Sequence, residues 1–432
     1  MNHSNTITPE NTTVGIIGLG YVGLPLAIQF AKSAVSTLGI DLDGEKVRKI
    51  SEGKSYIGHI PDDELAVLAQ AGKIRATTEM SAVAECDAVL ICLPTPLNKH
   101  REPDLSYVFN AGRDIASYLP KGCLVCLEST TYPGTTDEDL RDILESGSGM
   151  NAGEDFHLAY SPEREDPSNP DSKVASVPKL VGGYTPACLD KAIAIYGLAL
   201  SSLVPVESCK IAEAAKLLEN IFRSVNIALV NELKVIYDKM GIDIWKVIEA
   251  AKTKPFGFMP FYPGPGLGGH CIPIDPFYLS WKARQYGENT RFIELAGEIN
   301  TAMPDYVIQK VIIALNDQSK SIRGARILIL GLAYKPNVDD DRESPSYALI
   351  EKLEALGANV DYNDPYIPEI KPTREHAELA GRTSSQIRGH YDLILLATNH
   401  IAYHSYDFSD FKCPIVDTRN CISKRPAPYY KA

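Results

Sequence analysis

A glycine-rich turn near the start of the chain constrains the fold more than any other feature. Residues 13–20 form a short, nearly continuous apolar run, as expected for a strand buried on both faces of a parallel sheet. Gly18, Gly20 and Gly23 then follow in the order GxGxxG, and residues 26–32 carry apolar side chains at helical spacing. A glycine turn between a strand and a helix is typical of dinucleotide-binding folds. Its glycines permit the turn, the approach of a pyrophosphate and close helix packing.

An acidic residue at the end of the next strand predicts which dinucleotide is bound. Asp41 lies in the strand expected at residues 37–42. A carboxylate there accepts hydrogen bonds from ribose hydroxyls and repels the additional phosphate of NADP, which favours NAD. The helix that follows the turn offers backbone N–H groups to the phosphates, so Tyr21 and Val22 are assigned to the same cofactor site.

Alternating strands and helices predict an α/β fold. Strand-like runs at 88–93, 124–128, 157–160 and 179–181, with helical stretches between most of them, indicate a doubly wound, NAD-binding Rossmann domain over residues 1–205. A long helix without Gly or Pro is expected at 207–240, and a second helix from residue 243. The stretch 255–276 is too rich in Pro and Gly for a regular element.

The last third of the chain repeats the pattern of the first. Helical segments at 290–303 and 306–315 lead to a strand and glycine at 326–335, a helix at 346–356 and a strand ending in acids at 358–364. We therefore predict two Rossmann-like doubly wound domains joined by a long central helix. The central helical, dimerisation and catalytic-loop domain covers residues 206–305, and the second Rossmann-like domain covers 306–432.

Composition excludes several classes of partner. The 432 residues carry a net charge of −12 and no basic cluster, which argues against nucleic-acid binding. No apolar run approaches the roughly 18 residues of a membrane span, and the polar first dozen residues do not resemble a secretory signal. We expect a cytoplasmic protein whose nine irregularly spaced cysteines are mostly reduced.

One cysteine stands in surroundings that differ from those of the others. Cys271 follows Gly268, Gly269 and His270, so flexible backbone approaches it from one side. If Pro273 starts a helical turn, Cys271 lies near a helix N-terminus, which lowers the pKa of a thiol, and Asp275 shares its face. A buried small cysteine in a turn is the common alternative. We predict that Cys271 is the reactive cysteine.

Polar residues on the long helix and at two strand ends complete a candidate site. Lys216, Asn220 and Arg223 fall on one helix face. Their spacing fits a solvated face as well as it fits an oxyanion and sugar-hydroxyl site. Residues 128–131 and 161–164 end two expected strands, where doubly wound sheets bind ligands, although capping and turn chemistry also explain such residues.

Metal and redox sites are not predicted. Cys123 and Cys126 have the spacing of a redox pair, but they lie in an expected strand, where i and i+3 face opposite ways. His390, His400 and His404 lack a matching Cys or His cluster. Cys86 and Cys92 are interpreted as core residues.

From about residue 13 to residue 420 the chain resembles the UDP-sugar 6-dehydrogenases. The resemblance rests on seven ordered motifs: GLGYVGLP (18–25), Thr95-Pro96, EST (128–130), SPER (161–164), EAAKLLEN (213–220), GGHCIPID (268–275) and GLAYKPNVDDDRES (331–344). It implies that the first domain binds NAD, that the long helix forms the core of a homodimer or higher homo-oligomer, and that the last domain binds the UDP part of a UDP-sugar.

The resemblance also implies residue roles. Cys271 matches the catalytic nucleophile, and Lys216 and Asp275 match the residues that flank it in proton transfer and oxyanion stabilisation. Thr130, Glu163 and Asn220 match residues that position substrate and hydrolytic water, and Thr95, Thr130 and Arg342 match NAD contacts. The expected substrate-binding set is Glu163, Arg164, Lys216, Asn220, Arg223, Phe261, Tyr262, Gly268 and Lys335.

These roles imply a four-electron oxidation of the C6 primary alcohol to an acid. A thiolate retains the aldehyde, a thiohemiacetal gives up the second hydride, and the thioester is hydrolysed with help from a carboxylate such as Glu163. Residues 256–266 and the run Asn220-Ile221-Phe222-Arg223 resemble the branch acting on UDP-N-acetylhexosamines, especially UDP-N-acetylglucosamine. Because residues 256–266 contain no basic residue, no arginine is assigned to a neighbouring active site.

Three other interpretations remain open. The same chemistry on UDP-N-acetylmannosamine, UDP-N-acetylgalactosamine or UDP-glucose fits the motifs, because each of these sugars differs from UDP-N-acetylglucosamine at only one ring carbon. A β-hydroxyacid dehydrogenase shares the glycine motif but does not need Cys271 or a third domain. A nucleotide-sugar sensor would be free to lose the set Cys271, Lys216 and Asp275, which is intact.

Overall fold

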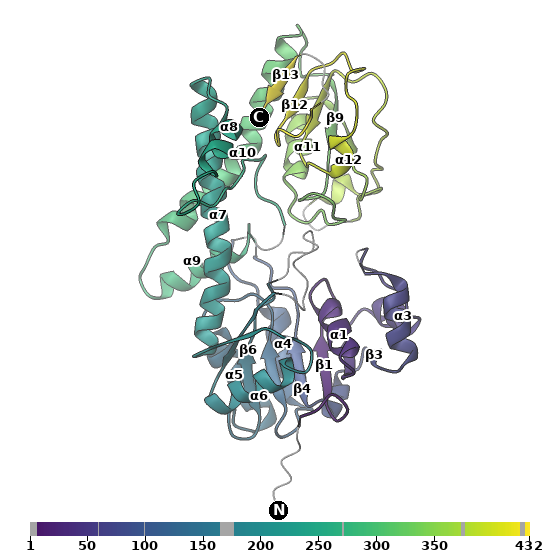
Figure 1. Ribbon diagram of the computed structural model, residues 1–432, viewed down its shortest axis with the longest axis vertical. Coiled ribbons are helices and arrows are strands. Elements are labelled where there is room, and N and C mark those ends of the chain that lie inside the picture. The colour runs from purple at the N-terminus through teal and green to yellow at the C-terminus, as the bar shows by residue number, and fades with distance from the viewer. Residues whose placement is uncertain are drawn as a thin grey trace, which may run out of the picture. The chain divides into compact units, whose positions relative to one another are not determined.

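The computed structural model describes residues 7–58, 60–98, 100–164, 177–269, 272–372, 376–423 and 428–432. The chain divides into two compact units. The first unit consists of Met1–Glu219 with Trp281–Gly287, and the second of Asn220–Ser280 with Glu288–Ala432. The division falls within one continuous helix, α7 (Cys209–Lys239), which is the long helix predicted from the sequence (Figure 1).

The first unit contains a doubly wound sheet. Over the described residues its eight strands lie in the order β3-β2-β1-β4-β5-β6-β7-β8. All neighbours are parallel except β6 and β7, which pair antiparallel. The strand bounds are β1 Thr13–Ile17, β2 Ser36–Ile40, β3 Ile74–Thr77, β4 Ala88–Ile91, β5 Leu124–Leu127, β6 His157–Tyr160, β7 Lys179–Gly183 and β8 Leu203–Val206. The strand order reverses between β1 and β4, which is where such sheets bind dinucleotides.

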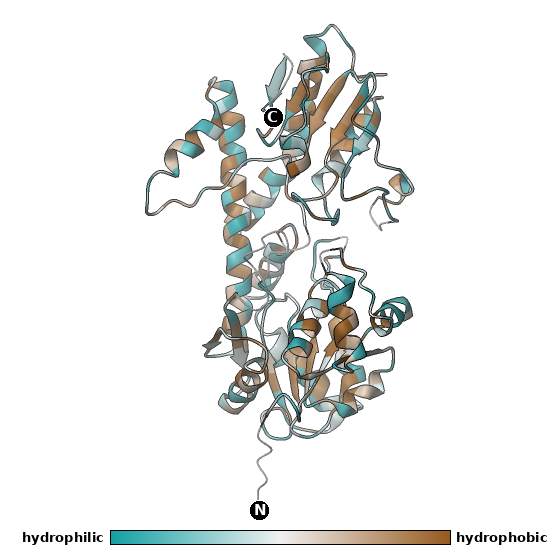
Figure 2. Cartoon of the chain, turned by 45° about the vertical axis from the view of Figure 1, so that its right-hand side comes forward, coloured by the Kyte–Doolittle hydropathy of each residue, from teal (hydrophilic) through white to brown (hydrophobic). Residues whose placement is uncertain are grey.

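Helices cover both faces of this sheet and bury the apolar strands. In β4, Ala88 and Leu90 pack into one core with α1 and α6, whereas Val89 and Ile91 pack into another with α4 and α5. Both faces are buried, so the strand sequence is continuously apolar rather than alternating (Figure 2). The helices are α1 Gly23–Lys32, α2 Gly44–Ser51, α3 Asp62–Gln70, α4 Ser106–Ala116, α5 Arg141–Ser148 and α6 Pro186–Tyr196, with the short turns η1 Met80–Glu85 and η2 Thr135–Leu140.

Beyond α7, the helices are α8 Ile244–Ala251, α9 Asp275–Gln285 and α10 Arg291–Asn316. The sequence predicted a break near Pro304, and this expectation is wrong, because α10 continues through it. Pro304 is buried, so tertiary packing retains the helix despite the lost backbone hydrogen bond. The stretch predicted to lack regular structure ends at Asp275, where α9 begins.

A second parallel sheet lies in the second unit. In the part of the chain that the structure describes, its five strands have the order β10-β9-β11-β12-β13, and all pairs are parallel. The bounds are β9 Arg326–Leu330, β10 Asn359–Asn363, β11 Leu393–Leu396, β12 Ile415–Asp417 and β13 Tyr429–Lys431, with α11 Pro345–Ala355, η3 Ala377–Leu379 and α12 Ile401–His404. The predicted second Rossmann-like fold is therefore present. None of the described helices is long and apolar enough to cross a membrane.

Candidate active site

The glycine turn leaves one side of its backbone open. Gly18 has φ +90°, and a Cβ on Gly23 would lie only 1.9 Å from the Gly18 carbonyl oxygen, so the turn and the close helix contact both require glycine. A Cβ on Gly20 would meet no protein atom within 4 Å. This open space at the N-terminus of α1, next to Tyr21 and Val22, suits the close approach of a pyrophosphate.

Asp41 follows β2 and is held by three donors. Its Oδ2 accepts from the Leu19 backbone N–H at 2.8 Å and from Lys46 Nζ at 3.0 Å, and its Oδ1 accepts from the Asp43 N–H at 3.0 Å. Burial by itself would raise the pKa of Asp41, but these hydrogen bonds outweigh it and lower the pKa below its usual value. The carboxylate is therefore ionised and fixed beside the glycine turn, as a ribose-binding acid must be.

Three polar residues follow neighbouring parallel strands at the same edge of the sheet. Thr95 lies after β4 and is buried, Thr130 lies after β5 and is half-buried, and Glu163 lies after β6. Ser129, next to Thr130, joins two of these strand ends: it accepts from the Leu93 N–H at 3.0 Å and donates to the Leu93 carbonyl at 2.7 Å. Ser129 is thus structural, and a ligand-binding role for Thr130 stays a prediction.

The turn Ser161–Arg164 is fastened to its surroundings. Lys216 of α7 donates to the Glu163 carbonyl oxygen at 2.5 Å. The Arg164 guanidinium donates to Glu219 of α7 at 2.6 Å and to the Pro178 carbonyl at 2.8 Å. Arg164, expected to bind substrate, therefore holds the turn on α7.

The second unit brings together three other residues of the candidate set. The Asn220 amide donates to Asp275 Oδ2 at 2.5 Å, and Arg223 donates to Asn220 Oδ1. Asn220 is 1% and Asp275 2% exposed, so this is a buried polar contact. Asp275 begins α9, where a negative charge is favoured by the helix dipole. Because residues 272–274 form a turn, the helix does not start at Pro273. Cys271 and His270 lie outside the described residues.

Glycines let the loop before α9 pack on the loop after β9. A Cβ on Gly268 would lie 2.8 Å from the Tyr334 Cβ, and the Gly269 N–H donates to the Arg342 carbonyl at 3.2 Å. The Arg342 side chain binds Asp340, and the Lys335 ammonium lies 5.5 Å from the centre of the Tyr334 ring. The expected substrate residue Gly268 and the expected contacts Lys335 and Arg342 thus belong to one pair of packed loops.

The aromatic loop carries the two remaining expected substrate residues. The Phe261 ring meets Phe222 of α7 edge-on, with ring centres 5.7 Å apart. Tyr262 is 44% exposed, and its hydroxyl donates to Glu249 at 2.8 Å. Neither contact tests a substrate role.

The other described cysteines are free thiols in buried or half-buried positions. Burial raises the pKa of Cys86 to about 12 and that of Cys92 well above its usual value, which supports the core interpretation of both. Cys188 differs, because hydrogen bonds from His157, Thr185 and two backbone N–H groups outweigh burial and lower its pKa to about 7. Cys188 is fully buried, and no sequence pattern indicated it.

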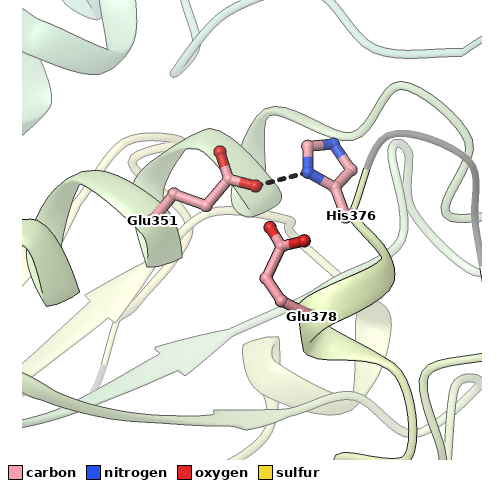
Figure 3. Close-up of side chains that lie close together, drawn as sticks. All are labelled: Glu351, His376 and Glu378. Atoms are coloured by element: carbon pink, nitrogen blue, oxygen red, sulfur yellow. Dashed lines mark hydrogen bonds and ion pairs between the residues drawn. The ribbon is translucent and has the colours of Figure 1, made fainter.

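One group of potential metal ligands occurs among the described residues. Glu351, His376 and Glu378 place ligand atoms within 4.8 Å of one another (Figure 3). His376 Nδ1 is hydrogen-bonded to Glu351 at 2.5 Å, and its ring stacks on Tyr347. The pair fastens the segment before η3 to α11, and that role needs no metal. The absence of a metal site therefore stays a prediction.

Three family domains match the chain in order. The UDP-glucose/GDP-mannose dehydrogenase family matches with its NAD binding domain at residues 12–199, its central domain at 210–302 and its UDP binding domain at 328–424. The chain belongs to this family. It is accordingly an NAD-dependent nucleotide-sugar dehydrogenase, and the predicted cofactor is confirmed.

Relatives in this dehydrogenase family carry more than one substrate name. A UDP-N-acetyl-D-glucosamine 6-dehydrogenase of Pseudomonas aeruginosa is 36% identical over 392 residues, which cover 90% of this chain and 91% of the relative. A UDP-N-acetyl-D-mannosamine dehydrogenase of Salmonella typhi is also 36% identical and covers 79% of this chain and 82% of the relative. The solved structure of a UDP-D-ManNAc dehydrogenase of Pyrococcus horikoshii has a TM-score of 0.87 at 32% identity, over 97% of this chain and 98% of that one.

Sequence reasoning did not find how the residues that support the site pair with one another. Asp364 and His400 fix the loop after β9, and Glu128 and Lys179 form a buried ion pair at the end of β5. The partners in these pairs are 36 and 51 residues apart. No motif or periodicity joins residues so distant, although a Lys and a Glu at the ends of two apolar strands were a visible signal.

Proposed function

We propose that the protein oxidises the C6 primary alcohol of a UDP-N-acetylhexosamine, with UDP-N-acetyl-D-glucosamine as the preferred substrate, to the uronic acid. The observation that carries the proposal is the ordered match of three family domains, with the motifs around Lys216, Asn220, Cys271 and Asp275 intact. The relatives named for UDP-N-acetylhexosamines support the substrate class.

NAD, held at the glycine turn and Asp41, would supply the hydride acceptor for two successive oxidations of the sugar carbon. The chain's own groups keep the intermediate in place between them. The Cys271 thiolate adds to the aldehyde carbon, so the aldehyde does not escape. The Lys216 ammonium and the Asn220 amide are donors suited to the oxygen that develops negative charge. Asp275, which binds the Asn220 amide, holds that amide in one orientation.

Release of the product needs water and a base. After the second hydride has left, the sugar carbon is a thioester on Cys271. A water oxygen attacks this carbon, Glu163 accepts the proton, and the carbon–sulfur bond breaks to return the thiolate. One alcohol, one water and two NAD⁺ give one carboxylate, two NADH and three protons.

The second candidate is the same reaction on UDP-N-acetylmannosamine, favoured by a relative of that name at equal identity and by the solved structure. A panel of UDP-sugars, each assayed with NAD for kcat/KM, separates the two. We expect UDP-N-acetylglucosamine to be used at least about tenfold better than UDP-glucose and better than its epimers. A higher kcat/KM for UDP-N-acetylmannosamine overturns the preferred substrate, and a higher value for UDP-glucose overturns the N-acetylhexosamine class.

A further inference from the structure

A buried ion pair lies directly beneath the turn that carries Glu163. Lys179, the first residue of β7, donates to Glu128 Oε2 at 2.6 Å and to the Pro162 carbonyl oxygen at 3.3 Å. The Tyr196 hydroxyl donates to the other oxygen of Glu128. The Glu128 side chain has no exposed area and that of Lys179 is 10% exposed. Both charges are therefore withdrawn from water, and each has the other as its counter-ion.

Such a pair is poorly explained as a stabilising contact. Removing two charges from water is unfavourable, and well-packed apolar residues of similar volume often stabilise a fold equally or better. The location of this pair suggests another role. Glu128 and Lys179 line a small cavity together with Val22 of the glycine motif, Pro162 and Glu163. The pair thus joins the carboxyl end of β5, the start of β7 and the turn after β6, at the cofactor-binding edge of the sheet.

Cations from three places hold this turn. Lys179 binds the Pro162 carbonyl, Lys216 of α7 binds the Glu163 carbonyl at 2.5 Å, and Arg164 of the turn itself reaches Pro178 and Glu219. Two successive carbonyl oxygens, those of Pro162 and Glu163, are thus fixed by ammonium groups. These two carbonyls belong to the peptide planes on either side of the Glu163 Cα, so fixing both planes fixes the direction in which the Glu163 side chain leaves the backbone.

We propose that Lys179 is a positioning residue, held in place by Glu128, that orients Glu163 for hydrolysis of the thioester. The inference rests on the proposed function, in which Glu163 accepts the proton of the attacking water. Loss of the Lys179 ammonium frees the Pro162 carbonyl and lets the turn rotate, while NAD binding and both hydride transfers depend on other groups. The hydrolysis step alone then slows.

Lys179→Met tests the proposal, and a second variant distinguishes a loss of positioning from a failure to fold. Lys179→Met leaves a buried carboxylate without its counter-ion, so Lys179→Met/Glu128→Gln, which removes both charges, is measured beside it. We expect kcat to fall at least about tenfold in both variants. We also expect the KM for NAD to stay within about twofold, and the acyl-enzyme to accumulate as a covalent adduct in intact-mass spectra of quenched samples. Lys179→Arg restores the charge and is expected to recover most of kcat.

Lys121→Met is the matched control, because Lys121 is an exposed lysine of the same unit, 79% accessible in its side chain. It is expected to retain the wild-type kcat and to accumulate no adduct. A folded double variant with wild-type kcat and no adduct overturns the proposal, and so does a variant in which the first hydride transfer is the step that slows.

Amide hydrogen exchange tests the positioning role of Lys179 independently of the proposed function. If Lys179 holds the turn, exchange in the segment 161–164 accelerates at least about tenfold in the double variant, while exchange in β1 and β4 does not change. Unchanged exchange in the turn overturns the positioning role even if the enzyme is active. A wild type that oxidises no UDP-sugar overturns the proposed function, and the exchange result still decides the role of Lys179.

Discussion

The two Rossmann-like sheets place an acid at the same position and use it differently. Asp41 follows β2 in the first unit, and Asp364 follows β10 in the second, each after the strand next to the first strand of its sheet. Asp41 accepts from two backbone N–H groups and from Lys46, and its side chain is 11% exposed. A small part of this side chain stays exposed, and we expect the ribose to bind there.

The Asp364 side chain, in contrast, has no exposed part. Its Oδ2 accepts from the Leu332 and Ala333 N–H groups at 2.7 and 2.8 Å and from His400 Nε2 at 3.0 Å. Its Oδ1 accepts from the N–H groups of Tyr366 and Ile367. The side chain is fully buried. Asp364 is thus bound by its own loops, whereas Asp41 is the acid that we expect to bind a ribose. We therefore expect the second domain to bind its nucleotide through other groups, such as Lys335.

The largest expected effect is a difference in stability between variants of Asp364 and of Asp41. Asp364→Ala leaves four N–H groups, three of them buried, and His400 without this acceptor, so we expect it to lower the free energy of unfolding by about 3 kcal/mol or more. Asp41→Ala, at a partly open position, is expected to lower it by about 1 kcal/mol. Thermal unfolding of both variants measures the difference, with roughly 2–4 °C expected for each kcal/mol. Equal losses would contradict the distinction between a ligand acid and a structural acid.

The next largest expected effect is a change in the preference for NAD over NADP when Asp41 is replaced. Asp41→Ser removes the charge that repels the NADP phosphate and releases Lys46 from its ion pair. Lys46 then becomes available to that phosphate. A charge-assisted hydrogen bond of about 1–3 kcal/mol shifts the ratio of kcat/KM for NADP and NAD by roughly ten- to a hundredfold.

Lys46→Met in the Asp41→Ser background is the control. It is expected to abolish most of the gain with NADP, because the phosphate then meets no cation. A gain that survives in the double variant shows that Lys46 plays no part in it, and a wild type that already prefers NADP shows that Asp41 does not select the cofactor.

The smallest expected effect concerns the choice of sugar substrate, which we assign to neither Asp41 nor Asp364. Arg223 donates to the Asn220 amide oxygen and is exposed, so its guanidinium remains able to donate to an acetamido carbonyl. UDP-glucose lacks that acceptor. We expect Arg223→Met to reduce the preference for UDP-N-acetylglucosamine over UDP-glucose by about tenfold in kcat/KM. An unchanged ratio removes Arg223 from substrate selection without affecting the assigned chemistry.

Local patterns in the sequence predicted much of this fold. The glycine turn, the acid Asp41 and helix α7 were predictable because each depends on residues close together in the chain. Continuously apolar strands such as β4 indicated burial on both faces for the same reason. The uninterrupted course of α10 through Pro304 was not predictable, because packing around the proline decides it.

The supporting residues of the site were not predictable for the same kind of reason. In the sequence, Asp364 looks like an acid at the end of a strand, as Asp41 does. Only its contacts with His400 and the loop after β9 show that Asp364 is structural. In the sequence, Glu128 lies at the end of one expected strand and Lys179 at the start of another. Their pairing depends on strand order, and β7 runs antiparallel to β6, which local periodicity does not encode.

The most direct test of the central proposal is the number of NADH molecules formed for each UDP-N-acetylglucosamine consumed, with Cys271→Ser as the matched variant. A four-electron oxidation through a cysteine predicts two NADH per sugar in the wild type. It also predicts that Cys271→Ser loses turnover while retaining UDP-sugar binding. One NADH per sugar, none at all, or wild-type turnover in Cys271→Ser would contradict the account.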